Sequence, residues 1–321
     1  MHKIGIIGAG PNASGHARYY AKSDRATVVA IADPAMDRAQ ALATEVGAKA
    51  VPDLKDFIAE VDAVVVASPN FLHHQHALAV AKAGKHLYCE KPMGLSAAQA
   101  REIAAAVAKA GVASQVGFSP RNSPNLYQMS QRAQSGVFGD LISVTSRRLM
   151  YMDKAKAAGW RADPEKSGGL LMEINIHELD WMMTCCGQVD WVFAQTWSAK
   201  PGHERANDHI WITLGFANGA HGQHEGSWSS PTPNYFRAVQ GVKGGASTDE
   251  WGNKLYVSQT GQNRVDEDPG AAFDLRGNWL DAIEGKAKAT ADCAWAERVM
   301  TVGEAVFASA RSGGKVFLKD V

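Results

Sequence analysis

A glycine-rich turn close to the start of the sequence constrains the fold more strongly than any other feature. Residues 4–7 form a short apolar run, and the turn at residues 8–13 separates this run from a helical pattern at 15–21. A strand, a glycine turn and a helix in this order are typical of domains that bind a dinucleotide. Gly8 permits the tight turn, Gly10 lets the backbone approach a pyrophosphate, and Ala13 lets the helix pack closely on the strand. We expect cofactor contacts from Gly8, Gly10, Pro11 and Asn12.

The first 120 residues alternate short apolar runs with alanine-rich helical patterns. This alternation predicts βαβ units and a parallel sheet, so we expect an α/β Rossmann domain over residues 1–120. The predicted strands are 4–7, 27–31, 63–67, 86–89 and 114–118. The predicted helices are 15–21, 37–46, 74–83 and 97–110.

The pattern changes from residue 121 onward, where longer runs alternate polar and apolar residues. They predict an α+β domain over 121–321 with a mostly antiparallel, open-faced sheet that serves substrate binding and oligomerisation. Because 321 residues exceed what one core usually serves, we expect the two domains to share a ligand-binding cleft. The predicted strands are 141–150, 189–199, 209–216, 220–229 and 236–242, and the predicted helices are 168–183, 273–284 and 295–310.

The composition argues against several classes of partner. Lysine plus arginine equals aspartate plus glutamate at 33 each, so the basic surface of a nucleic-acid binder or an anionic-membrane binder is not expected. We therefore expect a small-molecule partner. The four cysteines form no CxxC pair, which argues against a zinc ribbon or a disulfide scaffold. No signal peptide or membrane-spanning run is recognisable, and we expect a cytoplasmic protein.

Asp33 follows the second predicted strand, where a carboxylate normally accepts hydrogen bonds from the ribose hydroxyls of a dinucleotide. A carboxylate at this position repels a 2′-phosphate, which favours NAD over NADP. Arg38 lies close enough in the sequence to leave NADP open. In the alternative interpretation, Asp33-Pro34 is an ordinary turn or a helix cap.

Two polar segments follow the next predicted strands, at the edge where open parallel sheets bind ligands. Ser68-Pro69-Asn70 comes first and is predicted to contact the cofactor, although Ser68 or Asn70 can equally cap the following helix. Glu90-Lys91-Pro92 comes second. A lysine beside a nicotinamide can polarise a carbonyl or stabilise an alkoxide. The alternative for Glu90 and Lys91 is an exposed ion pair at a strand end.

Several of these residues occur in one combination, in which the glycine turn is accompanied by His16, Asp33, Ser68-Pro69-Asn70-x-x-His73 and Glu90-Lys91-Pro92. This combination resembles the Gfo/Idh/MocA family, the glucose-fructose oxidoreductase and inositol dehydrogenase group, over nearly the whole chain. The resemblance implies an NAD-dependent oxidoreductase that transfers hydride between the nicotinamide and a secondary alcohol or ketone of a sugar, polyol or inositol. It also implies that Lys91 contacts both substrate and nicotinamide, with Glu90 and His73 among the cofactor contacts.

A largely apolar helix predicted at 168–183 carries one polar stripe, Glu173, His177, Asp180 and Thr184. The stripe is either the solvated side of an amphipathic helix or a group that faces the cleft opposite Lys91. Histidine titrates near neutrality and can act as acid or base. The family resemblance assigns catalysis to His177 and Glu173 together with Lys91, but the family has aspartate where this chain has Glu173.

The same resemblance implies that Trp160 and Arg161 lie near the cofactor and that Arg121 lines the substrate pocket. A metal bound by Glu173 and His177 lacks a recognisable third ligand, so no metal is expected.

Tryptophans on the later strand patterns favour sheet packing or an interface, and we expect a homodimer or homotetramer. Two other functions stay open: an NAD-dependent glycoside hydrolase that oxidises its substrate transiently, and a non-catalytic cofactor-sensing regulator.

Overall fold

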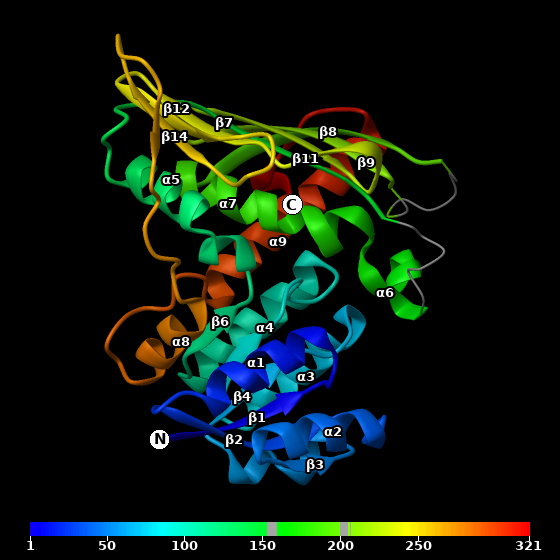
Figure 1. Cartoon of the computed structure of the whole chain (residues 1–321). Helices are drawn as coiled ribbons and strands as arrows, with labels where there is room; N and C mark the ends of the chain where they lie inside the picture. Colours follow the sequence, from blue (N-terminus) through cyan, green and yellow to red (C-terminus); the bar gives the residue numbers. More distant parts are fainter. Residues whose placement is uncertain (153–158, 200–204, 206) are drawn as a thin grey trace. The chain divides into compact units, whose positions relative to one another are not determined.

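The computed structural model describes residues 1–152, 159–199, 205 and 207–321 (Figure 1). Contacts divide the chain into two compact units. Unit 1 consists of Met1–Gly117 with Leu275–Glu297, and unit 2 consists of Phe118–Asp274 with Arg298–Val321. Unit 1 is therefore built from two separate stretches of the sequence. A single boundary between 1–120 and 121–321 does not describe this division. Both sequence stretches of unit 1 contribute to one hydrophobic core, since Trp279 and Leu280 pack with residues of the first stretch.

The sheet of unit 1 is parallel throughout its described residues, as predicted. Its strands follow the order β3-β2-β1-β4-β5-β6, in which the direction of winding reverses between β1 and β4. Ligands of such sheets bind at the carboxyl ends of the strands on either side of this reversal. The strands are β1 (His2–Ile7), β2 (Ala26–Ala32), β3 (Lys49–Val51), β4 (Ala63–Val66), β5 (His86–Cys89) and β6 (Ser114–Val116).

The helices α1 to α4 of unit 1 connect these strands and are rich in alanine, which favours helix and packs closely on a sheet. Two of them begin earlier than predicted: α1 begins at Pro11 and α3 at Asn70, directly after the loops that follow β1 and β4. The α-helices are α1 (Pro11–Ala21), α2 (Met36–Val46), α3 (Asn70–Lys82), α4 (Ala97–Ala110) and α8 (Leu275–Ile283), with 3-10 turns η1 (Leu54–Asp56) and η2 (Ile58–Glu60).

Unit 2 is built on a mostly antiparallel sheet, as predicted, and only β7 and β10 pair in parallel among its described strands. Its order is β15-β14-β13-β12-β7-β10-β9-β8-β16, with β11 paired to β7. The strands are β7 (Leu141–Tyr151), β8 (Val189–Trp197), β9 (His209–Phe216), β10 (His221–Ser227), β11 (Ser229–Asn234), β12 (Arg237–Gly241), β13 (Gly244–Thr248), β14 (Leu255–Gln259), β15 (Val265–Glu267) and β16 (Val316–Phe317).

Helices cover one face of this sheet, where α5, α7 and α9 lie side by side (Figure 1). The predicted strand at 220–229 is divided into β10 and β11. The strands β13 to β15 were not predicted, because β13 is rich in glycine and β14 and β15 are only five and three residues long. The helical elements are η3 (Ser119–Asn122), α5 (Pro124–Gln134), η4 (Gly159–Ala162), α6 (Pro164–Ser167), η5 (Leu171–Asn175), α7 (Ile176–Cys186), α9 (Cys293–Ser312), whose first residues belong to unit 1, and η6 (Leu318–Asp320). No helix in the described part of the chain combines the length and apolar character needed to cross a membrane.

Residues 169–186 are helical, as predicted for 168–183, but they do not form one regular α-helix. Gly168 ends α6 in a left-handed conformation, and a π-helical turn, η5, precedes α7. The side chain of Asn175 in η5 is fully buried and occupies the space beside Gly226 of β10, where it contacts His224. A Cβ on Gly226 would lie only 1.6 Å from Asn175 Nδ2. The π-turn therefore depends on a long-range contact that the local pattern does not contain. Such turns often occur at functional sites.

Replacing Gly226 with alanine should lower the free energy of unfolding by about 1–3 kcal/mol, the usual cost of overpacking a core. The added methyl group must displace Asn175 and His224, both buried. Urea denaturation followed by circular dichroism measures the change. Gly314→Ala is the matched control in unit 2, because its Cβ would come no closer than 3.7 Å to a neighbour. Equal stability of the two variants would contradict this account of the turn.

Candidate functional site

The glycine turn of unit 1 is tightly packed at one end and open at the other. Gly8 has a positive φ of 107°, and a Cβ there would lie 2.5 Å from the carbonyl oxygen of Ala67, so only glycine fits. Gly10 is the N-cap of α1, Pro11 follows it, and nothing lies within 4 Å of the position of a Cβ on Gly10. No side chain caps this helix, and its first turn holds no acidic residue. The exposed N–H groups at this helix start can bind an anion such as a pyrophosphate.

Asp33 lies beside this turn and is largely buried. Its Oδ2 accepts a hydrogen bond of 2.9 Å from the N–H of Ala9, and its Oδ1 accepts bonds from the N–H of Ala35 and from Arg38. The bond from Ala35 closes a local turn, which is one of the two alternatives that the sequence left open for Asp33. Asp33 is not the helix cap, because the N-cap of α2 is Ala35. Asp33 therefore joins the glycine turn to the start of α2 and places a carboxylate at the end of β2, where a ribose can be bound.

The loop after β4 is held by two histidines. His73 is buried, and its ring nitrogens lie 2.7 Å from the carbonyl oxygen of Ser68 and 2.8 Å from that of Pro92. It thereby links the loop after β4 to the loop after β5. The hydroxyl of Ser68 pairs with His76. The N-cap of α3 is Pro69, which has no capping side chain, so neither Ser68 nor Asn70 occupies the N-cap position.

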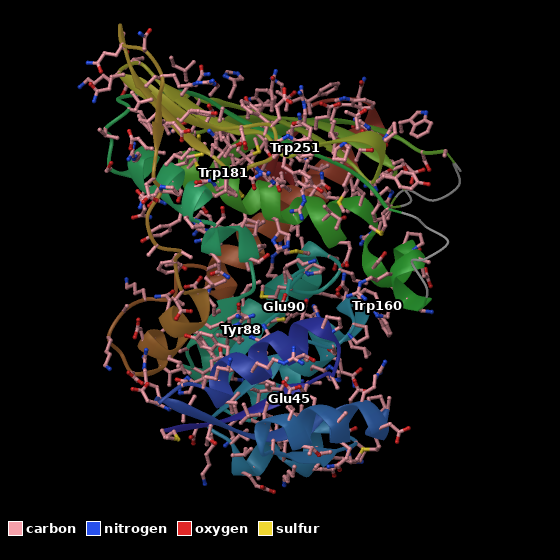
Figure 2. The ribbon with its side chains drawn as sticks, viewed as in Figure 1. Glu45, Tyr88, Glu90, Trp160, Trp181 and Trp251 are labelled. Carbon is pink, nitrogen blue, oxygen red and sulfur yellow. The ribbon has the colours of Figure 1, made fainter. Side chains whose placement is uncertain are left out.

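Glu90 and Lys91 directly follow β5, and Lys91 is joined to Pro92 by a cis peptide bond. The Glu90 carboxylate is mostly buried and accepts a hydrogen bond of 2.8 Å from Nε2 of His16 on α1. Figure 2 shows Tyr88 and Glu90 close together near α1. Burial opposes ionisation of Glu90, but the bond from His16 and the nearby positive charge of Lys91 hold its pKa below the ordinary value. The acid of this segment is therefore not an exposed surface ion pair.

In unit 2, Glu173 lies next to two other predicted site residues. Arg161 donates a hydrogen bond of 3.1 Å from Nε to Glu173, and its guanidinium lies 4.5 Å from the ring centroid of Trp160. Trp160 and Arg161 belong to η4, and Glu173 belongs to the π-turn η5. The carboxylate that replaces the expected aspartate is therefore balanced by a cation of its own unit.

Arg121 also has a partner within unit 2. It donates from Nε and Nη2 to the two oxygens of Asp180, at 2.9 Å and 2.7 Å, and from Nη2 to the hydroxyl of Thr184. The polar stripe of the helix is thus not its solvated side, because the Asp180 side chain is fully buried. The fork geometry fixes α7 to the η3 turn that carries Arg121.

His177 lies in the first turn of α7, and its ring packs edge-on against that of Phe118, with 6.3 Å between the ring centroids. The next residue, Glu178, was not singled out in the sequence, although an acid on the apolar side of a predicted helix is an available signal. It is fully buried and accepts hydrogen bonds from Arg237, Arg148 and Ser146. Burial alone would raise the pKa of Glu178, but the charges of Arg237 and Arg148 hold it well below its ordinary value. This ion pair anchors the helix that carries His177 to the sheet.

No group of three or more potential metal ligands is gathered among the residues that the structure describes. His224, a histidine of β10, is hydrogen-bonded to Asn175. The predicted site residues therefore form two separate sets. In unit 1 they surround the glycine turn and the ends of β4 and β5, and in unit 2 they lie on η3, η4, η5 and α7.

Comparisons with known proteins match both units. Residues 2–118 match a family model described as an oxidoreductase family with an NAD-binding Rossmann fold, and residues 126–247 match the GFO/IDH/MocA C-terminal domain. An uncharacterized oxidoreductase of Streptococcus pneumoniae is 30% identical over 269 residues, which cover 82% of this chain and 72% of that protein. A 1,5-anhydro-D-fructose reductase of Ensifer adhaerens is 26% identical and covers 98% of this chain and 97% of its own length.

A solved structure of levoglucosan dehydrogenase in complex with NADH has the same fold. It is superimposed with a TM-score of 0.89 at 22% sequence identity and covers 99% of both chains.

Replacing Glu178 with glutamine should lower the free energy of unfolding by about 3–5 kcal/mol, because Arg237 would be left as an uncompensated buried charge. The depressed pKa of Glu178 also sets a pH dependence: its stabilisation is present above the ordinary value of 4.5 and is lost as the pH falls below it. Urea denaturation across the acid range measures both effects. Glu165→Gln, at an exposed position of the same unit, serves as control. A loss no larger than in this control would contradict the anchoring role of Glu178.

Proposed function

This chain belongs to the Gfo/Idh/MocA family of NAD-binding oxidoreductases, and we propose that it transfers hydride between NAD and a secondary alcohol or ketone of a sugar, polyol or inositol. The observation that carries this proposal is the arrangement in unit 1. There the glycine turn, Asp33 and Lys91 follow β1, β2 and β5, which all end at the carboxyl edge of one parallel sheet. The name of the Ensifer adhaerens relative, a reductase of an anhydrosugar, supports the substrate class.

The residues of unit 1 fit the cofactor. The N–H groups at the start of α1 would hold the pyrophosphate, for which the open space at Gly10 leaves room. Asp33 would accept from the ribose hydroxyls and disfavour a 2′-phosphate, so NAD is preferred over NADP. Ser68-Pro69-Asn70, His73 and Glu90 would line the nicotinamide end, with Trp160 and Arg161 as further contacts from unit 2. When bound, the cofactor supplies the hydride acceptor or donor.

Lys91 and His177 perform the remaining chemistry in this proposal. Lys91 donates a hydrogen bond to the reacting oxygen of the substrate and stabilises the negative charge that develops there. His177 takes the hydroxyl proton during oxidation and returns it during reduction. Glu173 orients a neighbouring hydroxyl or the imidazole. Arg121 acts indirectly, because its guanidinium is held by Asp180 and so fixes the position of α7.

Lys91→Ala should lower kcat at least about 100-fold, the usual cost of losing electrostatic stabilisation of the reacting oxygen. Its dissociation constant for NADH, measured by fluorescence, should change less than about threefold, since the cofactor has many other contacts. His177→Asn should show the same pattern. The double variant should lose less than the product of the two single losses, because both residues serve one step. Lys82→Ala, an exposed lysine at the end of α3, is the control.

A screen of inositols, aldoses, anhydrosugars and glycosides with NAD and NADP identifies the substrate and separates the alternatives. The proposed function requires nicotinamide absorbance to change in step with substrate consumption. Release of an aglycone without net change in absorbance would replace it with the hydrolytic mechanism, and absence of any turnover would replace it with a regulatory role. Unchanged kcat in Lys91→Ala would exclude the assigned chemistry altogether.

We further propose that unit 2 forms a homodimer or homotetramer through the sheet face opposite α5, α7 and α9. Trp211 of β9 and Trp197 of β8 are 45% and 53% exposed on this face, and Phe317 lies on it as well. Large exposed aromatic groups on one surface are typical of interfaces. The four cysteines are buried free thiols, which supports a reducing, cytoplasmic location.

Trp211→Glu should convert the oligomer to a monomer, because a charge placed in an apolar interface cannot be buried there without a partner. Light scattering coupled to size-exclusion chromatography measures the mass. Trp251→Glu changes a tryptophan that follows β13 and is 57% exposed, more than Trp211, and it should leave the oligomer intact. A monomeric parent protein, or an oligomer unchanged by Trp211→Glu, would count against this interface.

A further inference from the structure

An arginine from the second stretch of unit 1 reaches the helix that starts at the glycine turn. Arg276 on α8 donates a hydrogen bond of 3.1 Å from Nε to Nδ1 of His16 on α1. Its guanidinium lies 5.4 Å from the ring centroid of Tyr19, and one of its nitrogens lies 3.4 Å from the position of a Cβ on Gly15. The guanidinium of Arg276 therefore packs against Gly15, His16 and Tyr19 of α1. Arg276 and His16 are 260 positions apart in the sequence.

The two hydrogen bonds of His16 define where its proton lies. A guanidinium only donates, so Nδ1 of His16 must accept from Arg276 and carries no hydrogen. Nε2 then carries the hydrogen and donates to the carboxylate of Glu90 at 2.8 Å. His16 is fully buried, with Tyr88 edge-on at 4.6 Å between ring centroids. The chain Arg276, His16, Glu90 thus ends next to Lys91.

We propose that Arg276 is a positioning residue of the reaction: by occupying Nδ1 it keeps His16 neutral, so that Glu90 remains an unneutralised carboxylate beside Lys91. Its effect on catalysis rests on the proposed function, whereas its effect on His16 does not. Arg276 touches neither Lys91 nor the glycine turn in any contact described above, so it acts only through His16 and Glu90.

The groups that face His16 determine what the loss of Arg276 does. Glu90 comes from the loop after β5, Arg276 from α8, Tyr20 from α1 and Tyr88 from β5. Burial lowers the pKa of His16, Glu90 opposes this effect, and the charge of Arg276 lowers the pKa further. Without Arg276, Nδ1 is open to a proton and the pKa must rise. His16 then becomes an imidazolium that pairs with Glu90 as the pH falls.

Nitrogen-15 NMR of histidine-labelled protein measures the protonation state of His16 directly, because the chemical shifts of Nδ1 and Nε2 depend on the tautomer and the charge of the ring. The parent His16, identified by its absence in His16→Gln, should show the neutral Nε2–H form from about pH 8 to pH 6, within the usual titration range of histidine. In Arg276→Met the signal should titrate to imidazolium within that window. Arg276→Lys should restore the neutral form, because it keeps a positive donor near Nδ1.

Kinetics test the link to Lys91. The ratio of kcat in Arg276→Met to kcat in the parent should fall about tenfold between about pH 8.5 and pH 6, since an imidazolium withdraws Glu90 from Lys91. Taking the ratio cancels the pH dependence that both proteins share. Arg25→Met is the matched control: it removes the ion pairs of Arg25 with Asp281 and Glu284, one within α8 and one just after it, without touching His16. Its ratio should not depend on pH.

The results separate the two proposals. A His16 that stays neutral in Arg276→Met would overturn the role of Arg276 whatever the activity is. A titrating His16 with a flat kcat ratio would overturn the link to Lys91 while leaving the tautomer assignment intact. If no sugar or polyol is turned over, the proposed function fails, and the NMR experiment alone decides whether Arg276 controls His16. If the kcat ratio of Arg25→Met depends on pH as strongly as that of Arg276→Met, then Arg276 only holds α8 in place and does not act through His16.

Discussion

The parallel register of β1, β4 and β5 is the constraint on which the proposed cofactor site of unit 1 depends. Parallel strands end at the same edge of a sheet, so the glycine turn, the Ser68 loop and Lys91 are brought together although they are up to about 80 residues apart. A Cβ on Gly8 would collide with the Ala67 carbonyl oxygen, so this edge leaves no room for a side chain there. Histidines then join the loops: His73 links the two loops after β4 and β5, and His16 links Glu90 to α1.

In unit 2, the main feature is a pair of buried carboxylates on the helix that carries the proposed acid/base group. Glu178 and Asp180 lie on α7 one and three residues after His177, and neither side chain is exposed. Each carboxylate faces an arginine from another element, Arg237 and Arg121 respectively. Pairs of this kind contribute little net stability compared with apolar packing, but breaking one is costly. They therefore define a single position for His177 rather than simply adding stability to the fold.

Much of unit 1 could be predicted from the sequence because strands buried on both faces are continuous apolar runs with turn signals at each end. The positions of Asp33 and Lys91 at strand ends followed from the same runs. The π-turn could not be predicted, since it depends on Asn175 filling the space beside Gly226, 51 residues away. The role of Arg276 was equally hidden, because a helical pattern at the end of the chain does not reveal which core it joins. Arg121 was recognised by resemblance, but its partner Asp180 required the folded chain.

The return of residues 275–297 to unit 1 has a consequence for how such a protein can be recombined. Trp279 and Leu280 belong to the core formed by the first strands, and Arg276 completes the hydrogen-bond chain through His16. A gene fragment that ends after β6 would encode the whole parallel sheet yet leave that core without these side chains. The nucleotide-binding module of this protein is therefore not a contiguous cassette: exchange of cofactor preference by swapping domains requires two matched segments rather than one.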